Sequence, residues 1–70
     1  MRHLKNFEVT GLAYIPGGKY EKVVTLTVQS ESNLGARIVY KQRVRMDLIR
    51  DLGRESVDCY IRIYSVRRVV

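Results

Sequence analysis

The chain contains little of the chemistry that enzymes and metal sites require. It has one cysteine, Cys59, one histidine, His3, and no tryptophan. One cysteine cannot form an intramolecular disulfide, and one cysteine with one histidine falls short of the four ligands of a structural zinc site. A nucleophilic cysteine also needs an activating base, so we expect Cys59 to be a small core residue and His3 to be solvated. The sequence therefore predicts no metal, no cofactor and no enzymatic activity.

Long hydrophobic runs are also missing. The longest stretches without a charged residue are Val9–Gly18 and Val23–Ser30, and both are far shorter than the roughly 20 residues of a membrane-spanning helix. Residues 1–9 carry no apolar stretch of the kind that follows the basic residues of a signal peptide. Together with the single cysteine, these absences predict a cytoplasmic, intracellular protein with no membrane association.

The chain is also short, with 70 residues, and we expect one small domain, residues 1–70. A domain of this size buries only about 60% of the surface that its unfolded chain exposes. Self-association is a natural way to enlarge such a core, and a second copy would cover the apolar strand end Val69–Val70. The sequence therefore predicts a homodimer that pairs through the edge of its C-terminal strand.

Positive charge, in contrast, is abundant and unevenly distributed. The net charge is +6 and the pI is about 9.9. Residues 36–70 carry nine Lys and Arg residues against four Asp and Glu residues, and eight of the nine are arginine. Arginine binds phosphate and carboxylate with two parallel hydrogen bonds and stacks on flat rings, which lysine does less well. This pattern indicates an anionic partner, although charge alone also serves solubility.

Two alternating segments predict a β-hairpin. Residues 5–15 alternate apolar and polar side chains, and Gly11 within them indicates a β-bulge or a close backbone approach. Pro16, Gly17 and Gly18 supply the turn. Residues 20–30 are rich in β-branched side chains and predict the second strand.

Residues 36–46 fit two interpretations. They alternate as a strand that places Arg37, Lys41, Arg43 and Arg45 on one side, and they also fit a helix with apolar residues at i, i+4 spacing. The β-branched residues and the shared side of the four cations favour the strand. Asp47 would then cap a short helix, residues 48–52, that Gly53 closes.

Residues 55–70 predict a long C-terminal strand. The predicted architecture is an α+β fold, predominantly antiparallel β, with a β-hairpin, a third strand, a short helix and the C-terminal strand. The alternative is a ββαβ order with a helix at about residues 36–52. In the preferred interpretation, the inward side chains are Val24, Leu26, Val28, Ile38, Tyr40, Val44, Val57, Cys59, Ile61 and Ile63, packed against Leu48, Ile49 and Leu52 of the helix.

The opposite face of the predicted sheet gathers cations and two tyrosines. Aromatic rings stack on bases and cations follow the phosphate backbone, so this face predicts a small basic regulatory protein that binds DNA or RNA. The alternative is a protein-interaction module, an inhibitor or adaptor that docks on an acidic partner, because Tyr and Arg also dominate protein interfaces. The candidate nucleic-acid-binding residues are Arg37, Lys41, Arg43, Arg45, Tyr60, Arg62, Tyr64 and Arg68.

Overall fold

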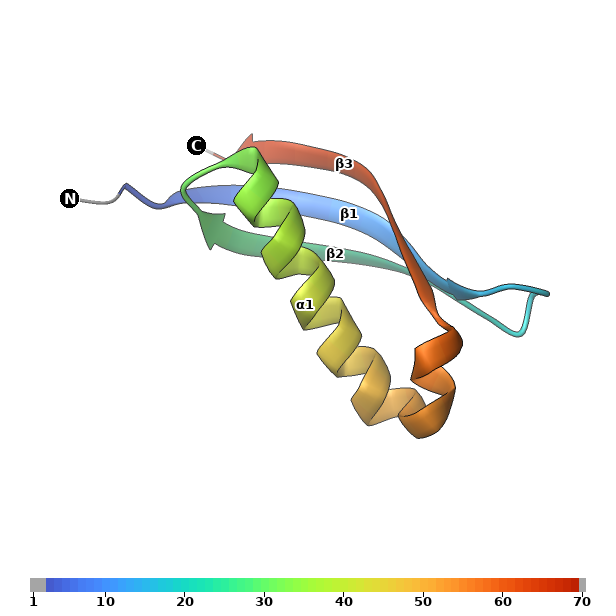
Figure 1. The fold of residues 1–70 in the computed structure, drawn as a ribbon. Coiled ribbons are helices and arrows are strands. Elements are labelled where there is room, and N and C mark those ends of the chain that lie inside the picture. The colour runs from blue at the N-terminus through green and yellow to red at the C-terminus, as the bar shows by residue number, and fades with distance from the viewer. Residues whose placement is uncertain (1–2, 70) are drawn as a thin grey trace.

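The computed structural model describes residues 3–69 and shows a ββαβ order (Figure 1). The elements are β1 (Lys5–Ile15), β2 (Tyr20–Ser30), the helix α1 (Asn33–Leu52), the short 3-10 helix η1 (Gly53–Asp58) and β3 (Tyr60–Val69). The strands form one antiparallel sheet in the order β2-β1-β3, and α1 lies against one face of it. The predicted α+β class, with a hairpin, a helix and a C-terminal strand, is confirmed.

The predicted hairpin forms as expected from its turn chemistry. β1 and β2 pair along their full lengths, from Lys5 opposite Ser30 to Ile15 opposite Tyr20. Gly17 and Gly18 have φ angles of 93° and 76° in the turn, a region that favours glycine because it has no Cβ. The two glycines therefore allow the chain to reverse between the strands.

The preferred prediction of a third strand at residues 36–46 is wrong, and the alternative of a helix at about 36–52 is confirmed. The i, i+4 series Ala36, Tyr40, Val44 and Leu48 is the buried stripe of α1, so tertiary packing outweighs the β-preference of the branched residues. The Ser32 side chain accepts a hydrogen bond from the Gly35 backbone N–H at 3.0 Å and caps the helix.

The end of α1 is partly as predicted. Gly53, with φ at 60°, closes the helix, but Asp47 lies within α1 instead of capping a short helix. Residues 53–58 form η1, so the last strand begins at Tyr60 and not at residue 55. Val57, predicted to face inward, lies on η1 and is 81% exposed.

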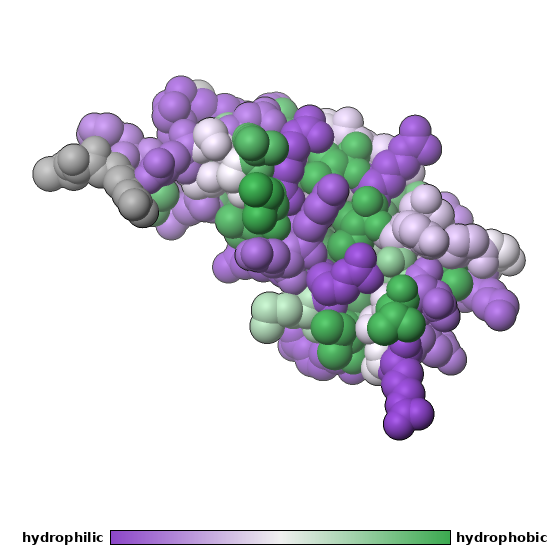
Figure 2. Space-filling view, viewed as in Figure 1, coloured by the Kyte–Doolittle hydropathy of each residue, from purple (hydrophilic) through white to green (hydrophobic). Residues whose placement is uncertain are grey.

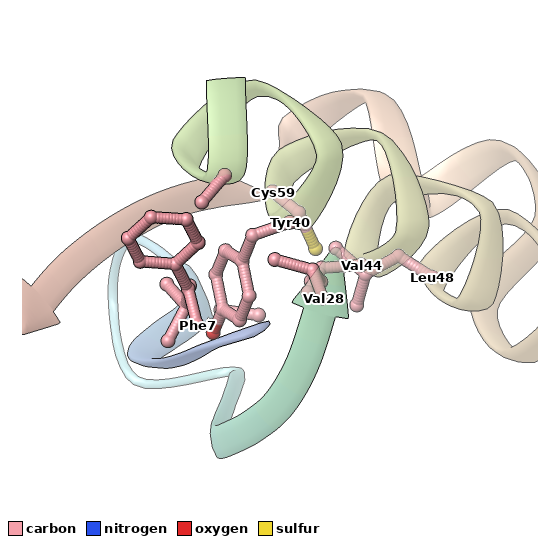
Figure 3. Packing of buried hydrophobic residues seen from close by; sticks show 9 residues of the cluster. Phe7, Val28, Tyr40, Val44, Leu48 and Cys59 are labelled. Carbon is pink, nitrogen blue, oxygen red and sulfur yellow. The ribbon is translucent and has the colours of Figure 1, made fainter. Parts of the chain in front are cut away.

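The core lies between the sheet and α1 (Figure 3). Cys59 is buried in it, as predicted. Ile38 and Ile49, also predicted to face inward, are each more than half exposed on α1, because both lie off the buried stripe of the helix. The buried hydrophobic residues are Phe7, Val9, Ala13, Val28, Ala36, Tyr40, Val44, Leu48 and Cys59.

Tyr40 is the largest fully buried side chain, and Gly11 makes room for it. The Tyr40 hydroxyl donates a hydrogen bond to the Val24 carbonyl oxygen at 2.7 Å. A Cβ atom at Gly11 would lie 2.8 Å from that hydroxyl oxygen and 2.6 Å from the carbonyl oxygen of Arg62. The predicted close backbone approach at Gly11 is therefore confirmed.

Tyr40→Phe is expected to lower the folding stability at neutral pH. It is also expected to remove the part of the stability loss above pH 10 that comes from ionisation of Tyr40. Burial raises the pKa of Tyr40 above its usual value, and a backbone hydrogen bond with Gly11 offsets part of this rise. The unfolded chain ionises this group above about pH 10 while the folded chain keeps it neutral, so its contribution is complete below pH 10 and is lost as pH rises. The variant also leaves the Val24 carbonyl without its donor, which costs about 1–3 kcal/mol.

Urea unfolding of wild type and Tyr40→Phe across the alkaline range measures both effects. We expect the stability difference between the two proteins to narrow above pH 10 by up to about 1.4 kcal/mol per pH unit. A difference that stays constant with pH would show that Tyr40 ionises equally in the folded and unfolded chains.

Candidate nucleic-acid interface

The eight candidate residues do not share one sheet face. Because residues 36–46 belong to α1, the cations Arg37, Lys41, Arg43 and Arg45 lie on the helix. Tyr60, Arg62, Tyr64 and Arg68 lie on β3. The predicted Arg/Tyr-rich sheet face is therefore wrong as a single surface, and the candidates divide between the two sides of the sheet.

A β-bulge divides the candidates on β3 again. The register with β1 shifts between Thr10 and Gly11, so that Thr10 lies opposite Ser65, Gly11 lies opposite Ile63, and Tyr64 is left without a partner. One extra residue reverses the side to which all following side chains point. The bulge that Gly11 predicts is thus present, but its extra residue, Tyr64, lies on β3 and not on β1.

The consequence of the bulge is largest for Arg68. Arg62 lies opposite Leu12, on the sheet face away from α1, whereas Arg68 lies opposite the buried Phe7 and so points to the side that α1 occupies. Strict alternation had placed Arg62 and Arg68 on the same face. Arg67, which is not among the candidate residues, lies opposite Glu8 and points to the sheet face away from α1.

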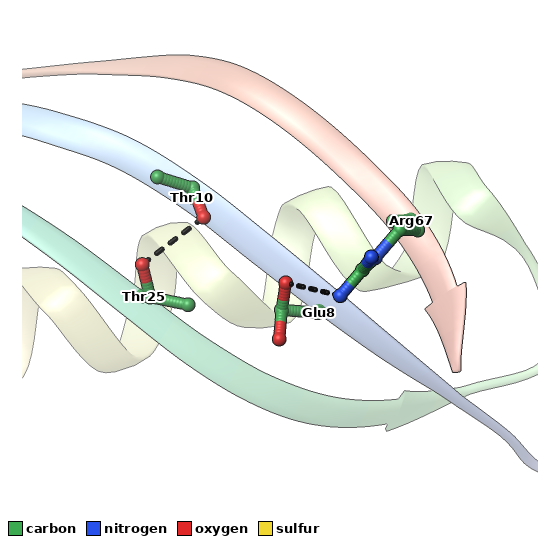
Figure 4. Close-up of polar contacts among 4 residues, drawn as sticks. All are labelled: Glu8, Thr10, Thr25 and Arg67. Carbon is green, nitrogen blue, oxygen red and sulfur yellow. Dashed lines mark hydrogen bonds and ion pairs between the residues drawn. The ribbon is translucent and has the colours of Figure 1, made fainter. Parts of the chain in front are cut away.

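The sheet face away from α1, here called the open sheet face, carries aromatic residues but little net charge. The Tyr14 and Tyr60 rings stack with centroids 5.8 Å apart, and the Arg62 guanidinium lies 6.0 Å from the Tyr64 ring centroid. Figure 4 shows the polar contacts farther along this face, where Arg67 pairs with Glu8 at 2.9 Å and the Thr10 and Thr25 hydroxyls lie 3.0 Å apart. Glu8 and Glu21 balance the two arginines, so this face attracts phosphate weakly.

The flank of α1 that faces β3 carries the unbalanced charge. Arg37, Lys41 and Arg45 follow one another at i, i+4 intervals, and Arg45 contacts the chain just before β3. Arg68 lies on β3 on the same side of the sheet. We call the three exposed cations Arg37, Lys41 and Arg68 the α1–β3 basic flank.

Within the described residues 3–69, no carboxylate pairs with this flank. Within residues 3–69, none of its three cations forms an ion pair, and residues 33–46 contain no Asp or Glu. Arg37 Nε donates a hydrogen bond to Asn33 Oδ1 at 3.1 Å, a neutral acceptor. The flank is therefore an exposed positive surface.

Arg43 and Arg45 lie elsewhere on the helix. Arg43 is exposed on the flank toward β2, where it lines hollows together with Thr27 and Leu26. Arg45 is half-buried, and its Nη1 donates hydrogen bonds to the carbonyl oxygens of Ser56 and Cys59, both at 3.0 Å. Arg45 thus joins α1 to both ends of the turn into β3.

Arg45→Ala is expected to destabilise the fold by about 1.5–3 kcal/mol, because two carbonyl groups lose a charged donor. Arg43→Ala removes the same side chain from an exposed position two residues away and is expected to change stability by less than about 0.5 kcal/mol. Chemical denaturation of the two variants measures this difference. Equal losses would mean that the two Arg45 hydrogen bonds do not stabilise the turn.

Other kinds of site have little support in the described part of the chain. Among residues 3–69, no group of three or more His, Cys, Asp or Glu side chains is placed to hold a metal ion. Over the same residues, no helix has both the length and the apolar character needed to span a membrane.

Comparisons with known proteins do not assign the chain to a family. No protein-family model, curated protein or solved structure matches it. A function for this chain must therefore be argued from its own residues.

Proposed function

We propose that this chain is a small non-enzymatic protein that binds nucleic acid by holding backbone phosphates along the α1–β3 basic flank. The observation that carries the proposal is the set of three exposed cations on the α1 side of the sheet, Arg37, Lys41 and Arg68, without a carboxylate partner among residues 3–69. Guanidinium groups bind phosphate oxygens through paired, charge-assisted hydrogen bonds. The proposed location is the cytoplasm, since the buried free thiol of Cys59 needs no oxidising compartment.

The tyrosines have a secondary place in this proposal. Tyr60 and Tyr64 are 58% and 55% exposed, which leaves ring surface for a base, but they lie on the open sheet face and not beside the α1–β3 basic flank. Tyr60 already stacks on Tyr14, and Tyr64 contacts Arg62. Phosphate contacts from the flank are therefore the main expected source of affinity, with little preference among sequences.

An acidic protein partner is the second candidate, because carboxylates bind the same arginines. Capture from lysate with and without nuclease treatment separates the two candidates. Recovery of a partner that nuclease does not remove would favour the protein-interaction module. The predicted homodimer also remains a proposal, and the sheet leaves two edges, β2 and β3, free for a second copy.

Binding of short labelled single strands and duplexes, followed by fluorescence anisotropy across salt concentrations, tests the proposal. Each neutralised phosphate releases counterions, so three contacts per chain predict a slope of log K against log salt of about −2.7 for duplex DNA. Affinity should then fall about 40-fold between about 50 and 200 mM salt. No binding to either form, or binding that is independent of salt, would rule the proposal out.

A further inference from the structure

The two free edges of the sheet differ sharply in charge. In the strand order β2-β1-β3, both β2 and β3 expose backbone groups that no neighbouring strand satisfies. The β3 edge carries Arg62, Arg67 and Arg68, whereas β2 has no charged residue from Val23 to Ser30. Proteins commonly protect an edge from pairing with charged side chains. Here charged side chains protect β3 at Arg62, Arg67 and Arg68, whereas β2 has no charged side chain from Val23 to Ser30.

We propose that the β2 edge is an interface for a second copy of this chain, whose β2 pairs with it in antiparallel orientation. The product is a homodimer with a continuous six-stranded sheet in the order β3-β1-β2-β2-β1-β3. A two-fold axis perpendicular to the sheet relates the copies, so the same patch is used twice. This inference concerns assembly and does not depend on nucleic-acid binding.

Charge complementarity identifies a second copy as the occupant and β2 as the edge. Like charges directly opposite one another across two strands are destabilising. Two β2 strands bring only uncharged residues together over Val23–Ser30, and their charged ends carry one acid and one base, Glu21 and Lys22. Two antiparallel β3 strands would instead bring three arginines of each copy, Arg62, Arg67 and Arg68, into one interface. The homodimer predicted through the C-terminal strand is therefore better placed at β2.

The surface beside β2 has two open hollows that side chains of a second copy would fill. A hollow of about 510 Å³ lies between the end of β2 and α1, and a second of about 300 Å³ follows it toward the end of α1. Arg43 lines both hollows. Asn6, Thr27, Gln29 and Val39 line the first hollow, and Leu26, Met46, Asp47 and Arg50 complete the second.

Apolar side chains on β2 and on α1 are also exposed, and a second copy would cover them. Met46 on α1 is 68% exposed, and Val23 on the open sheet face is 63% exposed. Figure 2 shows apolar patches separated by hydrophilic side chains on the side of the molecule viewed in Figure 1. In the proposed dimer, both α1 helices lie on the same face of the sheet, because the two-fold axis is perpendicular to it. Their flanks toward β2, including Met46, then face each other.

An edge of 11 residues is long enough for a stable contact. It extends over about 37 Å at about 3.4 Å per residue. Specific interfaces bury about 1,200–2,000 Å² in total, which a pair of strands reaches with the help of the side chains that flank them. The exposed Met46 and the half-buried Val39 supply such flanking surface on α1.

Two matched charge variants test which edge is used. Thr27→Lys adds a cation to an exposed position of β2, opposite Glu8, and Ser65→Lys adds one to an exposed position of β3, opposite Thr10. Both side chains lie on the open sheet face of edge strands, so both substitutions are compatible with the fold, which circular dichroism and thermal unfolding check. Sedimentation equilibrium should show a wild-type dimer whose dissociation constant rises at least about fivefold in Thr27→Lys and stays unchanged in Ser65→Lys.

Cysteine cross-linking provides a second readout that does not depend on destabilisation. The only native thiol, Cys59, is buried, so a new surface cysteine reacts alone. At least one of Val23→Cys, Thr25→Cys and Thr27→Cys should form a disulfide-linked dimer under mild oxidation, and Ser65→Cys should not. A monomeric wild type at several hundred micromolar, dissociation by Ser65→Lys instead of Thr27→Lys, or a cross-link only at Ser65→Cys would each overturn the proposal.

Discussion

Gly11→Ala is expected to cost about 3 kcal/mol of folding stability, as overpacking of a tightly packed position does. The new Cβ atom would lie 2.6 Å from the Arg62 carbonyl oxygen and 2.8 Å from the Tyr40 hydroxyl oxygen. Neither group is free to move, since Arg62 belongs to the neighbouring strand and Tyr40 is fully buried. A domain of this size has only about 3.5–10 kcal/mol of stability in total, so this methyl group removes a large share.

Thermal and urea unfolding of Gly11→Ala measure this loss against Gly17→Ala. A Cβ atom at Gly17 would meet nothing within 4 Å, so that variant bears only the strain of a positive φ, about 1–2 kcal/mol. Adding Tyr40→Phe to Gly11→Ala should restore little of the lost stability, because the new Cβ atom still meets the Arg62 carbonyl oxygen. Similar losses at Gly11 and Gly17 would show that the close approach of β1, β3 and Tyr40 is not a packing constraint.

The triple variant Arg37→Gln, Lys41→Gln and Arg68→Gln is expected to weaken nucleic-acid binding roughly 100-fold. Three exposed ion pairs with phosphates contribute up to about 1 kcal/mol each, and about 3 kcal/mol corresponds to a factor of this size. Stability should change little, because the three side chains are exposed and form no ion pair within residues 3–69.

The matched control for this variant removes three exposed cations elsewhere. Lys19→Gln, Lys22→Gln and Arg54→Gln lower the net charge by the same amount but leave the α1–β3 basic flank intact. Titration of both variants with the same labelled oligonucleotide separates a local surface from overall charge. Equal weakening would show that binding follows the net charge of +6 and that the flank has no special role.

The sequence predicted the parts of the fold that depend on local chemistry. The structure confirms the predicted turn at Gly17 and Gly18, the helix end at Gly53 and the burial of Cys59. Each of these predictions rests on the conformation or burial of the residue itself. Gly11 belongs with them, because a missing Cβ within a strand has few physical reasons other than a bulge or a close approach.

The helix was harder to predict because the apolar residues of 36–46 fit both the two-residue period of a strand and the 3.6-residue period of a helix. Ile38, Val39 and Val44 have strand preferences, and the same segment places Tyr40 and Val44 one helical turn apart. The signal that decides between them lies outside the segment, where Ser32 caps the helix and Gly53 ends it. A capping residue and a terminating glycine that bound one segment favour a single helix between them.

The candidate site failed as a single face for two physical reasons. Four of its residues moved to α1 with the change of secondary structure, and the bulge at Gly11 reversed the side of Arg68 relative to Arg62. A bulge is a property of the pairing between two strands, so the sequence of β3 alone does not reveal it. The excess of arginine was visible in the sequence, but its distribution among surfaces required the register.

The salt dependence of binding tests the central claim most directly. For duplex DNA, wild type and the Lys19, Lys22 and Arg54 control should each show a slope of log K against log salt of about −2.7 per chain, and the Arg37, Lys41 and Arg68 variant should show a slope near zero. Such a result would locate the phosphate contacts on the α1–β3 basic flank. An unchanged slope in the flank variant, or a wild type that does not bind, would contradict the account.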